Sequence, residues 1–573
     1  MVSTADTAFS GAQYLMGLQV FVRLATFSMN AVVIILAGGE AFGVASVRFE
    51  LLLSTILFLS REGMRNVLLR IDADRGAGSQ VRPNTDRSNV HRRRPPVHEQ
   101  RIINAALIPI GAGIAMASAL YIYYVAYGPR SSASADQPHY YVSLTLYILA
   151  AWIELCVEPL FALSRSRMLF KLQAKCEGIA VAGRCTSVVL VLLVGRYPGG
   201  GIGGNPFKLA AFAVGQMAYA VLILLSYLWT MSCELKYSVW SCYLPRRVAL
   251  DSEGKQVSYI GPAVKDLAVT LVGQSLLKHF LTQGDNMVMA KFATPAEMGT
   301  FAFISNYGSI PARIVFLPLE EASRAMFSKM ANRGSGSASA DDAGFFSMSA
   351  DDARISRHVL TTLGKLHLLI GTILLVFGTL LSPTLLSLIG QRDLAMQHTL
   401  AAYCIYLPFM GMNGFLEAFA HCVATKKQLL RISTWMSCFT VVYALFAIQM
   451  LHGLELGSAG MVIANMVNMA LRISYCWRFI SQWFGRLDVG GGPRLSAMLP
   501  HPAVLYTCLL SGAVILAALT LTDQQELLNQ AATLAASAAL GIVVLREIWH
   551  KEQPFIQSVL TLRSGQLQRP RSE

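Results

Sequence analysis

Arginine side chains lie within or at the ends of several long apolar segments of this sequence. Five of these residues are Arg23, Arg48, Arg61, Arg313 and Arg472. A guanidinium group binds phosphate oxygens through paired hydrogen bonds, and it stays charged in almost any protein environment. This residue type in an apolar setting therefore predicts that the protein binds an anionic, phosphate-bearing group.

The apolar segment that begins VRFE and ends SREGMR carries charge at both ends. Arg48 and Glu50 lie at one end, and Arg61, Glu62 and Arg65 lie at the other. A helix rises about 1.5 Å per residue, so Arg48 and Arg61 would be about 20 Å apart. A bilayer core is about 30 Å thick, so at least one of these charges must lie at membrane depth or snorkel outward.

Polar residues three, four, seven or eleven positions apart fall on one face of a helix. The faces found in this way carry Gln19, Arg23, Thr26 and Asn30; Glu154 and Glu158; Gln274, Lys278 and Asp285; Asn306, Ser309, Arg313 and Glu320; Asn413 and Glu417; and Asn465, Asn468 and Arg472. Ionisable residues inside a membrane usually face a bundle interior or a wet cavity. We therefore predict a polar, partly cationic interior.

Structural roles remain open for some of these residues. Glu154 and Glu158 are also consistent with salt bridges that hold helices together. Arg65 is also consistent with a side chain that snorkels to the interface. Asn465 and Asn468 are also consistent with ordinary hydrogen bonds between helices.

The composition indicates which kind of structural element, a membrane-spanning helix, must position these side chains. Of the 573 residues, 54% are hydrophobic and only 14% are charged, and the mean hydropathy is +0.48. Soluble domains carry closer to a quarter charged residues. We therefore predict an all-α polytopic membrane protein, and we read the net charge of +14 as basic loops rather than a nucleic-acid surface. No Walker A, HExxH, GxSxG or CxxC pattern occurs, so we expect no enzymatic activity, no ATP hydrolysis, no cofactor and no metal site.

Hydropathy predicts about fourteen spans. They are 13–37, 43–66, 102–127, 140–163, 174–195, 207–231, 264–290, 297–324, 356–382, 398–423, 430–452, 456–480, 502–521 and 529–549. Two hydrophilic interruptions, 71–100 and 331–355, read as flexible loops. The layout predicts two six-helix lobes, 1–231 and 264–481, joined by a loop at 232–263. The last two spans and a tail occupy 482–573.

Lysine and arginine gather in the loops that follow even-numbered spans. The 71–100 loop contains HRRRPP, whereas the loops after odd-numbered spans are nearly free of basic residues. Cytosolic loops carry this excess of basic residues. The pattern predicts that both termini lie in the cytosol.

Several segments together resemble the Rft family. They include LQVFVRLATFSMNAVVI, ELCVEPLFALSRSRMLFKL, NYGSIPARIVFLPLEEA and VIANMVNMALRISY, and they occur in the family's order over roughly residues 13–482. The resemblance does not cover the 71–100 loop, the 331–355 loop or the last two spans.

The resemblance implies a fold and a cargo. The family belongs to the multidrug/oligosaccharidyl-lipid/polysaccharide exporter superfamily, whose lobes enclose an alternating-access cavity. It implies an endoplasmic reticulum membrane protein that translocates a five-mannose oligosaccharide on dolichol diphosphate for N-glycosylation, without ATP. With the polar faces described above, it implies that the cavity is lined by Arg23, Asn30, Arg48, Arg61, Glu62, Glu154, Glu158, Lys278, Asn306, Arg313, Glu320, Asn413, Glu417 and Arg472.

In that reading the charges of the second span line a hydrated cleft. Arg61 would meet an anionic head group near the cytosolic mouth, Arg48 would lie near the lumenal end, and Glu50 and Glu62 would offset their charge. Two alternatives remain: an accessory protein that holds the same lipid without moving it, and an antiporter of the same superfamily. An antiporter requires a titratable acid, and Glu154 or Glu417 could serve.

Overall fold

A computed structural model describes most of the chain. The described residues are 34, 36–73, 95–126, 137–167, 169–195, 206–235, 237–249, 257–259, 262–334, 348–487, 491–521 and 527–563. Helices lie at the predicted spans within these ranges, and the first predicted span, 13–37, falls almost wholly outside them. Ten helices in the described part are long and apolar enough to cross a membrane. The protein is therefore a multi-pass membrane protein, and its described part is helical apart from one two-stranded ribbon.

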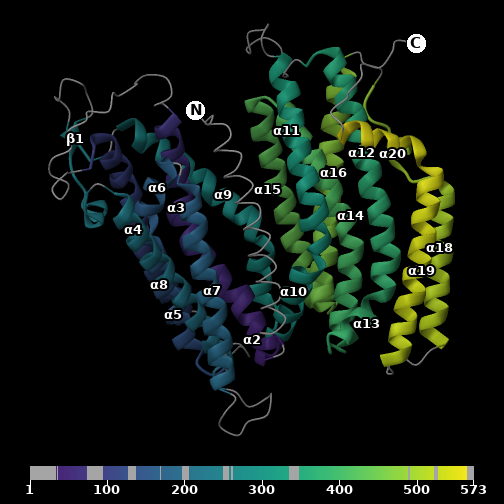
Figure 1. Cartoon of the computed structure of the whole chain (residues 1–573), viewed down its shortest axis with the longest axis horizontal. Coiled ribbons are helices and arrows are strands. Elements are labelled where there is room, and N and C mark those ends of the chain that lie inside the picture. Colours follow the sequence, from purple (N-terminus) through teal and green to yellow (C-terminus); the bar gives the residue numbers. More distant parts are fainter. Residues whose placement is uncertain are drawn as a thin grey trace. The chain divides into compact units, whose positions relative to one another are not determined.

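Contacts within the chain form two compact units, Met1–Ala302 and Phe303–Glu573. The helices of the first unit (Figure 1) are α2 (Gly39–Gly43), η1 (Val44–Phe49), α3 (Glu50–Ala73), α4 (Val97–Ala126), α5 (Tyr140–Leu155), α6 (Glu158–Ser166), α7 (Phe170–Val194), α8 (Lys208–Glu234) and α9 (Pro262–Phe292). The segment between α8 and α9 contains η3 (Val239–Tyr243) and the antiparallel strands β1 (Val248–Ala249) and β2 (Val257–Ser258). Helix α10 (Pro295–Gly308) contains the boundary between the units.

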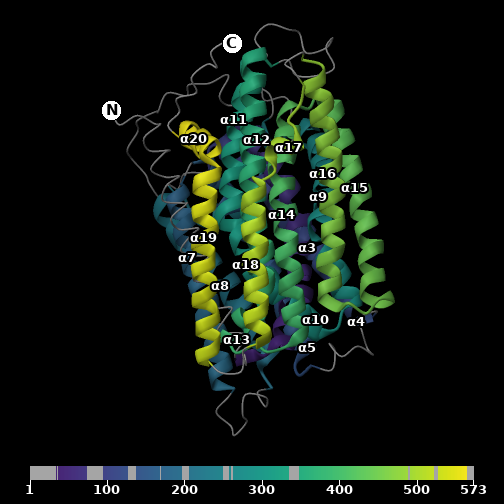
Figure 2. The same ribbon diagram turned by 90° about the vertical axis from the view of Figure 1, so that its right-hand side faces the viewer.

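The second unit continues from α10. Its helices are η4 (Ala312–Phe316), α11 (Leu317–Gly334), α12 (Ala350–Ile373), η5 (Leu374–Gly378), α13 (Thr379–Leu388), α14 (Leu394–Val423), α15 (Lys426–Ile448), η6 (Gln449–Gly453), α16 (Gly457–Gly485), α17 (Leu495–Met498), α18 (Pro502–Leu521), α19 (Leu527–Lys551) and α20 (Gln553–Arg563). Helices α18 and α19 run side by side, and α20 turns away from α19 at its end (Figure 2).

Several details differ from the sequence-based expectations. Helices extend into both predicted loops, because α4 begins at Val97, α11 ends at Gly334 and α12 begins at Ala350. Helix α20 follows the last span where only a tail was expected. The division between units falls at Ala302 and groups α9 with the first unit, and the lobe boundaries at 231 and 264 stay a prediction.

Local sequence explains where helices begin and break. Thr425 forms a capping box with Gln428 at the start of α15. Ser349 and Asp393 cap the starts of α12 and α14, since each side chain accepts a hydrogen bond from a backbone N–H that the helix leaves free. Pro159 lies at the start of α6, directly after the break that separates it from α5. A proline fits the first helical turn but not the interior of the preceding helix.

Each unit has its own apolar core. In the first unit the loop between α8 and α9 contributes to it, since Tyr237, Val239 and Cys242 pack with Leu160. In the second unit Phe419 stacks against Phe484 at the centre of α11, α12, α14 and α16. A separate cluster that includes Val376 and Val504 packs α18 and α19 against α12 and η5. These apolar cores fix how the helices of each unit pack, and therefore which polar helix faces lie against one another.

Candidate binding site within the helices

Two arginines of α3 pair with two glutamates that follow one another along α5 and α6. The Arg61 Nη1 group donates to Oε1 of Glu154 at 2.8 Å. Arg65 donates to both oxygens of Glu158, at 3.0 Å from Nε and 2.6 Å from Nη2. The two arginines are four residues apart on α3, and the two glutamates are four residues apart along α5 and α6. Both ion pairs therefore form between the same face of α3 and the same face of the α5–α6 segment. The predicted face of Glu154 and Glu158 therefore lies against the face of α3 that carries Arg61 and Arg65.

These pairs are partly screened from solvent. The side chains of Glu154 and Glu158 are 9% and 4% exposed, whereas those of Arg61 and Arg65 are 22% and 24% exposed. Removing one partner of a buried pair leaves an uncompensated charge and costs several kcal/mol. The ion pairs therefore stabilise the packing of α3 against α5 and α6. The more exposed edges of the two guanidinium groups still reach the surface of the unit.

The partners of Glu50 and Glu62 differ from the expected ones. Glu50 lies 3.8 Å from Arg184 of α7, and Glu62 accepts a hydrogen bond from Nζ of Lys278 at 3.1 Å. Neither carboxylate pairs with Arg61. The reason is geometric: Glu50 and Glu62 face α7 and α9, whereas the face of Arg61 is turned toward α5.

Arg48 is buried within its unit and is only 5% exposed. It lies in η1, near the phenol groups of Tyr124 and Tyr140. Its Nε and Nη1 groups have no hydrogen-bond partner among the described residues. Arg48 therefore does not line the surface of the first unit in this conformation, and its role at the lumenal end of a cleft stays a prediction.

A second cluster of charges joins α14 and α16 in the second unit. Arg472 donates to Oε2 of Glu417 at 2.8 Å, and Asn413 donates to the same oxygen at 3.0 Å. His421 lies one turn further along α14, with its Nε2 atom 3.8 Å from Glu417. Glu320 of α11 pairs with Arg324 at 2.7 Å. Three of the predicted residues, Asn413, Glu417 and Arg472, thus form one network.

Arg313 is exposed and lies in the π-helical turn η4. No described residue forms an ion pair or a side-chain hydrogen bond with it. Asn306 lies partly buried two turns earlier on α10, and its backbone carbonyl accepts from the Ser309 hydroxyl at 3.3 Å. An uncompensated guanidinium group in the middle of a predicted span is costly in lipid and needs water or an anion beside it.

Some site predictions stay outside the described residues, and some charged residues were missed. Arg23 and Asn30 belong to the first predicted span and cannot be placed. Arg184 and Arg324 were not predicted to belong to the site. A signal for Arg184 was present, because it is a lone arginine near the middle of an apolar span. No group of three or more potential metal ligands occurs in the described part of the chain.

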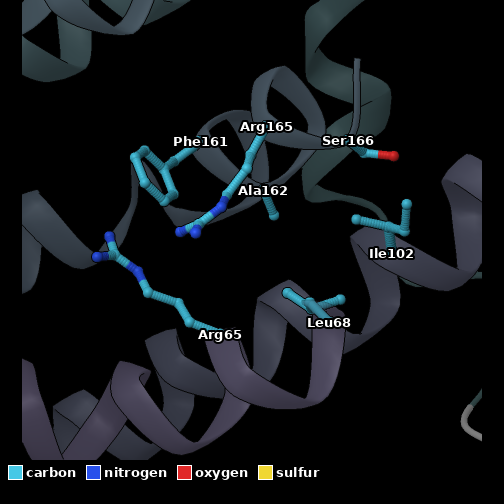
Figure 3. A pocket seen from close by; sticks show the side chains of 7 residues that line it. All are labelled: Arg65, Leu68, Ile102, Phe161, Ala162, Arg165 and Ser166. Carbon is cyan, nitrogen blue, oxygen red and sulfur yellow. The ribbon is translucent and has the colours of Figure 1, made fainter. Parts of the chain in front are cut away.

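A small hollow lies beside Arg65 at one end of the first unit. It is lined by Arg65, Leu68, Ile102, Phe161, Ala162, Arg165 and Ser166, as Figure 3 shows. Its volume is about 20 Å³, close to the space that one water molecule requires.

The sequence of the chain matches a known protein family. The profile described as Rft protein matches residues 7–562. The protein named Man(5)GlcNAc(2)-PP-dolichol translocation protein RFT1 from Saccharomyces cerevisiae is 28% identical over 500 residues, covering 84% of each chain. The protein of the same name from Yarrowia lipolytica is 28% identical over 84% of this chain and 70% of its own length. The one from Xenopus tropicalis is 26% identical over 88% and 87%.

Structural comparison finds transporters. The lipid II flippase MurJ in an inward closed conformation aligns with a TM-score of 0.53 at 11% identity, over 93% of this chain and 98% of its own. A multidrug resistance MATE family transporter of the MOP superfamily, in an inward-facing conformation, aligns with a TM-score of 0.51 at 13% identity, over 82% and 98%. At these identities the likeness shows a shared fold alone.

Proposed function

Because the chain belongs to the Rft protein family, we propose that it moves a dolichol-diphosphate oligosaccharide from the cytosolic to the lumenal leaflet of the endoplasmic reticulum membrane. The relatives named above are called translocation proteins for Man(5)GlcNAc(2)-PP-dolichol. A sugar head group cannot cross hydrocarbon unaided, since its hydroxyl groups would lose their hydrogen bonds. Polar helix faces would replace water while the dolichyl chain stays in lipid. No chemical reaction and no ATP hydrolysis are part of this proposal.

The observation that carries the proposal is the guanidinium group of Arg313, which no described residue neutralises. It is exposed in the middle of a predicted span, where a lipid contact costs about 2.5–3.5 kcal/mol. A diphosphate would supply the missing negative charge through paired hydrogen bonds. In the first unit, Arg61 is a further proposed phosphate-binding cation, and it would exchange Glu154 for a phosphate oxygen when cargo binds. Arg23, in the segment outside the described residues, is another proposed cation.

The remaining predicted residues have supporting parts in the same proposal. Glu154, Glu158 and Glu417 would prevent the cations from holding the cargo too tightly, since each already pairs with an arginine. Lys278, paired with Glu62 and 59% exposed, would lie at the edge of the site. Asn306, Glu320 and Asn413 would offer hydrogen bonds to sugar hydroxyl groups.

The antiporter alternative has less support. An antiporter requires a carboxylate that is free to bind and release a proton. Glu154 and Glu417, the two candidates, are each engaged by an arginine at 2.8 Å. We therefore propose lipid transport rather than ion-coupled export.

The test is reconstitution of the purified full chain into vesicles with the authentic lipid-linked oligosaccharide, followed by its accessibility to a lectin or glycosidase in the outer leaflet. Transport that is lost in Arg313→Gln supports a translocator. Tight binding of the lipid without transport would instead assign the accessory role. Arg478→Gln on α16 is a suitable control, because Arg478 is an exposed arginine outside the proposed site.

Orientation is tested separately. We propose that both termini and the segments 71–100, 232–263 and 331–355 face the cytosol, as their basic residues predict. Cysteines introduced into these segments in microsomes should react with an impermeant reagent added outside. Labelling of the 71–100 segment only after the membrane is opened would overturn the assigned orientation.

A further inference from the structure

Arg65 and Arg165 reach the small hollow of Figure 3 from different helices. Arg65 extends from α3, Arg165 extends from α6, and both guanidinium groups lie on the side of the Phe161 ring. Leu68 and Ile102 form the apolar wall opposite. Arg165 belongs to none of the predicted polar faces, and the position of Arg65 in the sequence is consistent with snorkelling to the interface.

Arg65 is held in place by two contacts. Its Nε and Nη2 groups bind Glu158, and its guanidinium carbon lies 4.1 Å from the centre of the Phe161 ring. Stacking on an aromatic face fixes the plane of a guanidinium group and lowers the entropy that a ligand must remove. The Nη1 group of Arg65 has no hydrogen bond to a described residue, so one donor edge remains available.

Arg165 supplies the unpaired charge. Its side chain is exposed, and no described carboxylate forms an ion pair with it. It lies in the last turn of α6, where a cation complements the helix dipole, but its side chain extends toward the hollow (Figure 3). Its neighbour Arg167 is neutralised, since Glu99 accepts from it at 2.7 Å. Arg61 and Arg65 are matched by Glu154 and Glu158, whereas no described carboxylate balances the charge of Arg165.

The position of the hollow matches the depth of lipid head groups. It lies where α6 ends and a few residues after the start of α4, both of which are ends of candidate membrane spans. Phosphate groups of a bilayer lie at this depth, outside the hydrocarbon core. An apolar wall beside two guanidinium groups fits a phosphate that carries an acyl or prenyl chain.

We propose that Arg165 and Arg65 form a binding site for the phosphate group of a single lipid head group at the membrane interface. Arg65 and Arg165 line the hollow, and their guanidinium groups would bind the phosphate oxygens there. Two lipids share this chemistry: an acidic phospholipid of the bilayer and a polyprenyl diphosphate like that of the proposed cargo. The site does not depend on translocation, so it stands or falls separately from the proposed function.

The test is native mass spectrometry of the purified full chain, titrated in parallel with phosphatidic acid and with a short-chain polyprenyl diphosphate. Arg165→Gln should weaken the first binding event for at least one probe by five-fold or more, because it removes a charge-assisted hydrogen bond. The matched control is Arg478→Gln, which removes an exposed arginine from α16 and should change neither affinity by more than two-fold. No described residue pairs with Arg165, so this variant should fold as the parent does, and thermal unfolding checks this.

The two arms identify the source of the phosphate. A loss confined to phosphatidic acid assigns the site to bilayer phospholipid, and a loss confined to the diphosphate assigns it to the cargo lipid. Equal affinities of Arg165→Gln and the parent chain for both probes would overturn the proposal. A translocation assay that fails in the parent chain would count against the proposed function, but it would leave this binding measurement intact.

Discussion

Arg61 and Glu154 form an ion pair between α3 and α5, with Nη1 of the arginine 2.8 Å from Oε1 of the glutamate. Glu154 is almost completely buried, whereas Arg61 retains an exposed edge. The glutamate therefore depends on the arginine, but the arginine can still bind another group. This asymmetry permits Arg61 to have both a structural and a cargo-binding role, and the two roles are separable by mutation.

Arg61→Ala should lower the stability of the protein by about 3 kcal/mol, because it leaves Glu154 buried without a partner. Arg61→Ala combined with Glu154→Gln should recover most of that stability, since no uncompensated charge remains. The double variant should still fail to restore N-glycosylation in cells that lack the endogenous protein, because the guanidinium group of residue 61 is absent. Arg61→Lys should have intermediate activity, as it keeps the charge and loses the bidentate geometry. Full glycosylation by the double variant would assign Arg61 a structural role only.

Glu417 and Arg472 should be strongly coupled in the second unit. A double-mutant cycle with Glu417→Gln and Arg472→Gln, read by thermal unfolding in detergent, should give an interaction energy of about 1–3 kcal/mol. The control is the pair of Glu320 and Arg324, whose side chains are 28% and 47% exposed. That pair should give about 0.5 kcal/mol or less, because exposed pairs within a helix are screened. Equal coupling in the two cycles would contradict the network described for α14 and α16.

Gly43 should not tolerate a side chain. A Cβ atom there would lie 2.2 Å from the backbone nitrogen of Gly299, which cannot move aside as a flexible side chain could. Glycines permit this close approach of helices. Gly43→Ala should therefore reduce the amount of folded protein, measured by size-exclusion chromatography. Gly111→Ala is the control, since nothing lies within 4 Å of its Cβ position and alanine favours helix. A folded, abundant Gly43→Ala protein would contradict this close packing.

Asn104 should hold the segment after α8 against α4. Its Nδ2 group donates to the backbone carbonyls of Arg246 at 2.6 Å and Tyr259 at 3.0 Å, and its Oδ1 accepts from the Arg246 backbone nitrogen at 3.1 Å. Asn104→Leu removes all three bonds, so trypsin should cleave at Arg246 and Arg247 several times faster than in the parent chain.

The control for this experiment is Gln216→Leu, which changes an equally buried amide of α8. Faster cleavage in both variants would indicate general loosening of the unit rather than release of this segment.

Cys242 should be unreactive toward thiol reagents at neutral pH. Burial, assisted by the nearby Glu99 carboxylate, raises the pKa of its thiol to about 12, and only the thiolate is nucleophilic. Cys233, one of the exposed cysteines, should react much faster. Mass spectrometry after timed alkylation at pH 7.5 measures the reaction rates of both cysteines, and denaturation of the protein should make the two rates similar. Rapid modification of native Cys242 would show that η3 is not packed as described.

The sequence by itself determined the membrane class and the positions of the helices. Hydropathy is a local property, so α18 begins and ends at the predicted residues 502 and 521, and most other spans differ from prediction by a few residues. Terminal turns such as those of α4 and α11 were missed, because helices extend beyond the apolar window into polar sequence. The local sequence pattern also showed which charged residues lie inside the predicted spans.

Only the tertiary structure decided which charges meet. Helix periodicity showed that Glu154 and Glu158 share a face, but not that α3 packs against that face and brings Arg61 and Arg65 to it. Glu62 directly follows Arg61 in sequence, yet it pairs with Lys278, more than two hundred residues away. The partner of a charged side chain depends on which helices are neighbours and on their rotation. Both follow from packing of the whole bundle, which no local sequence pattern encodes.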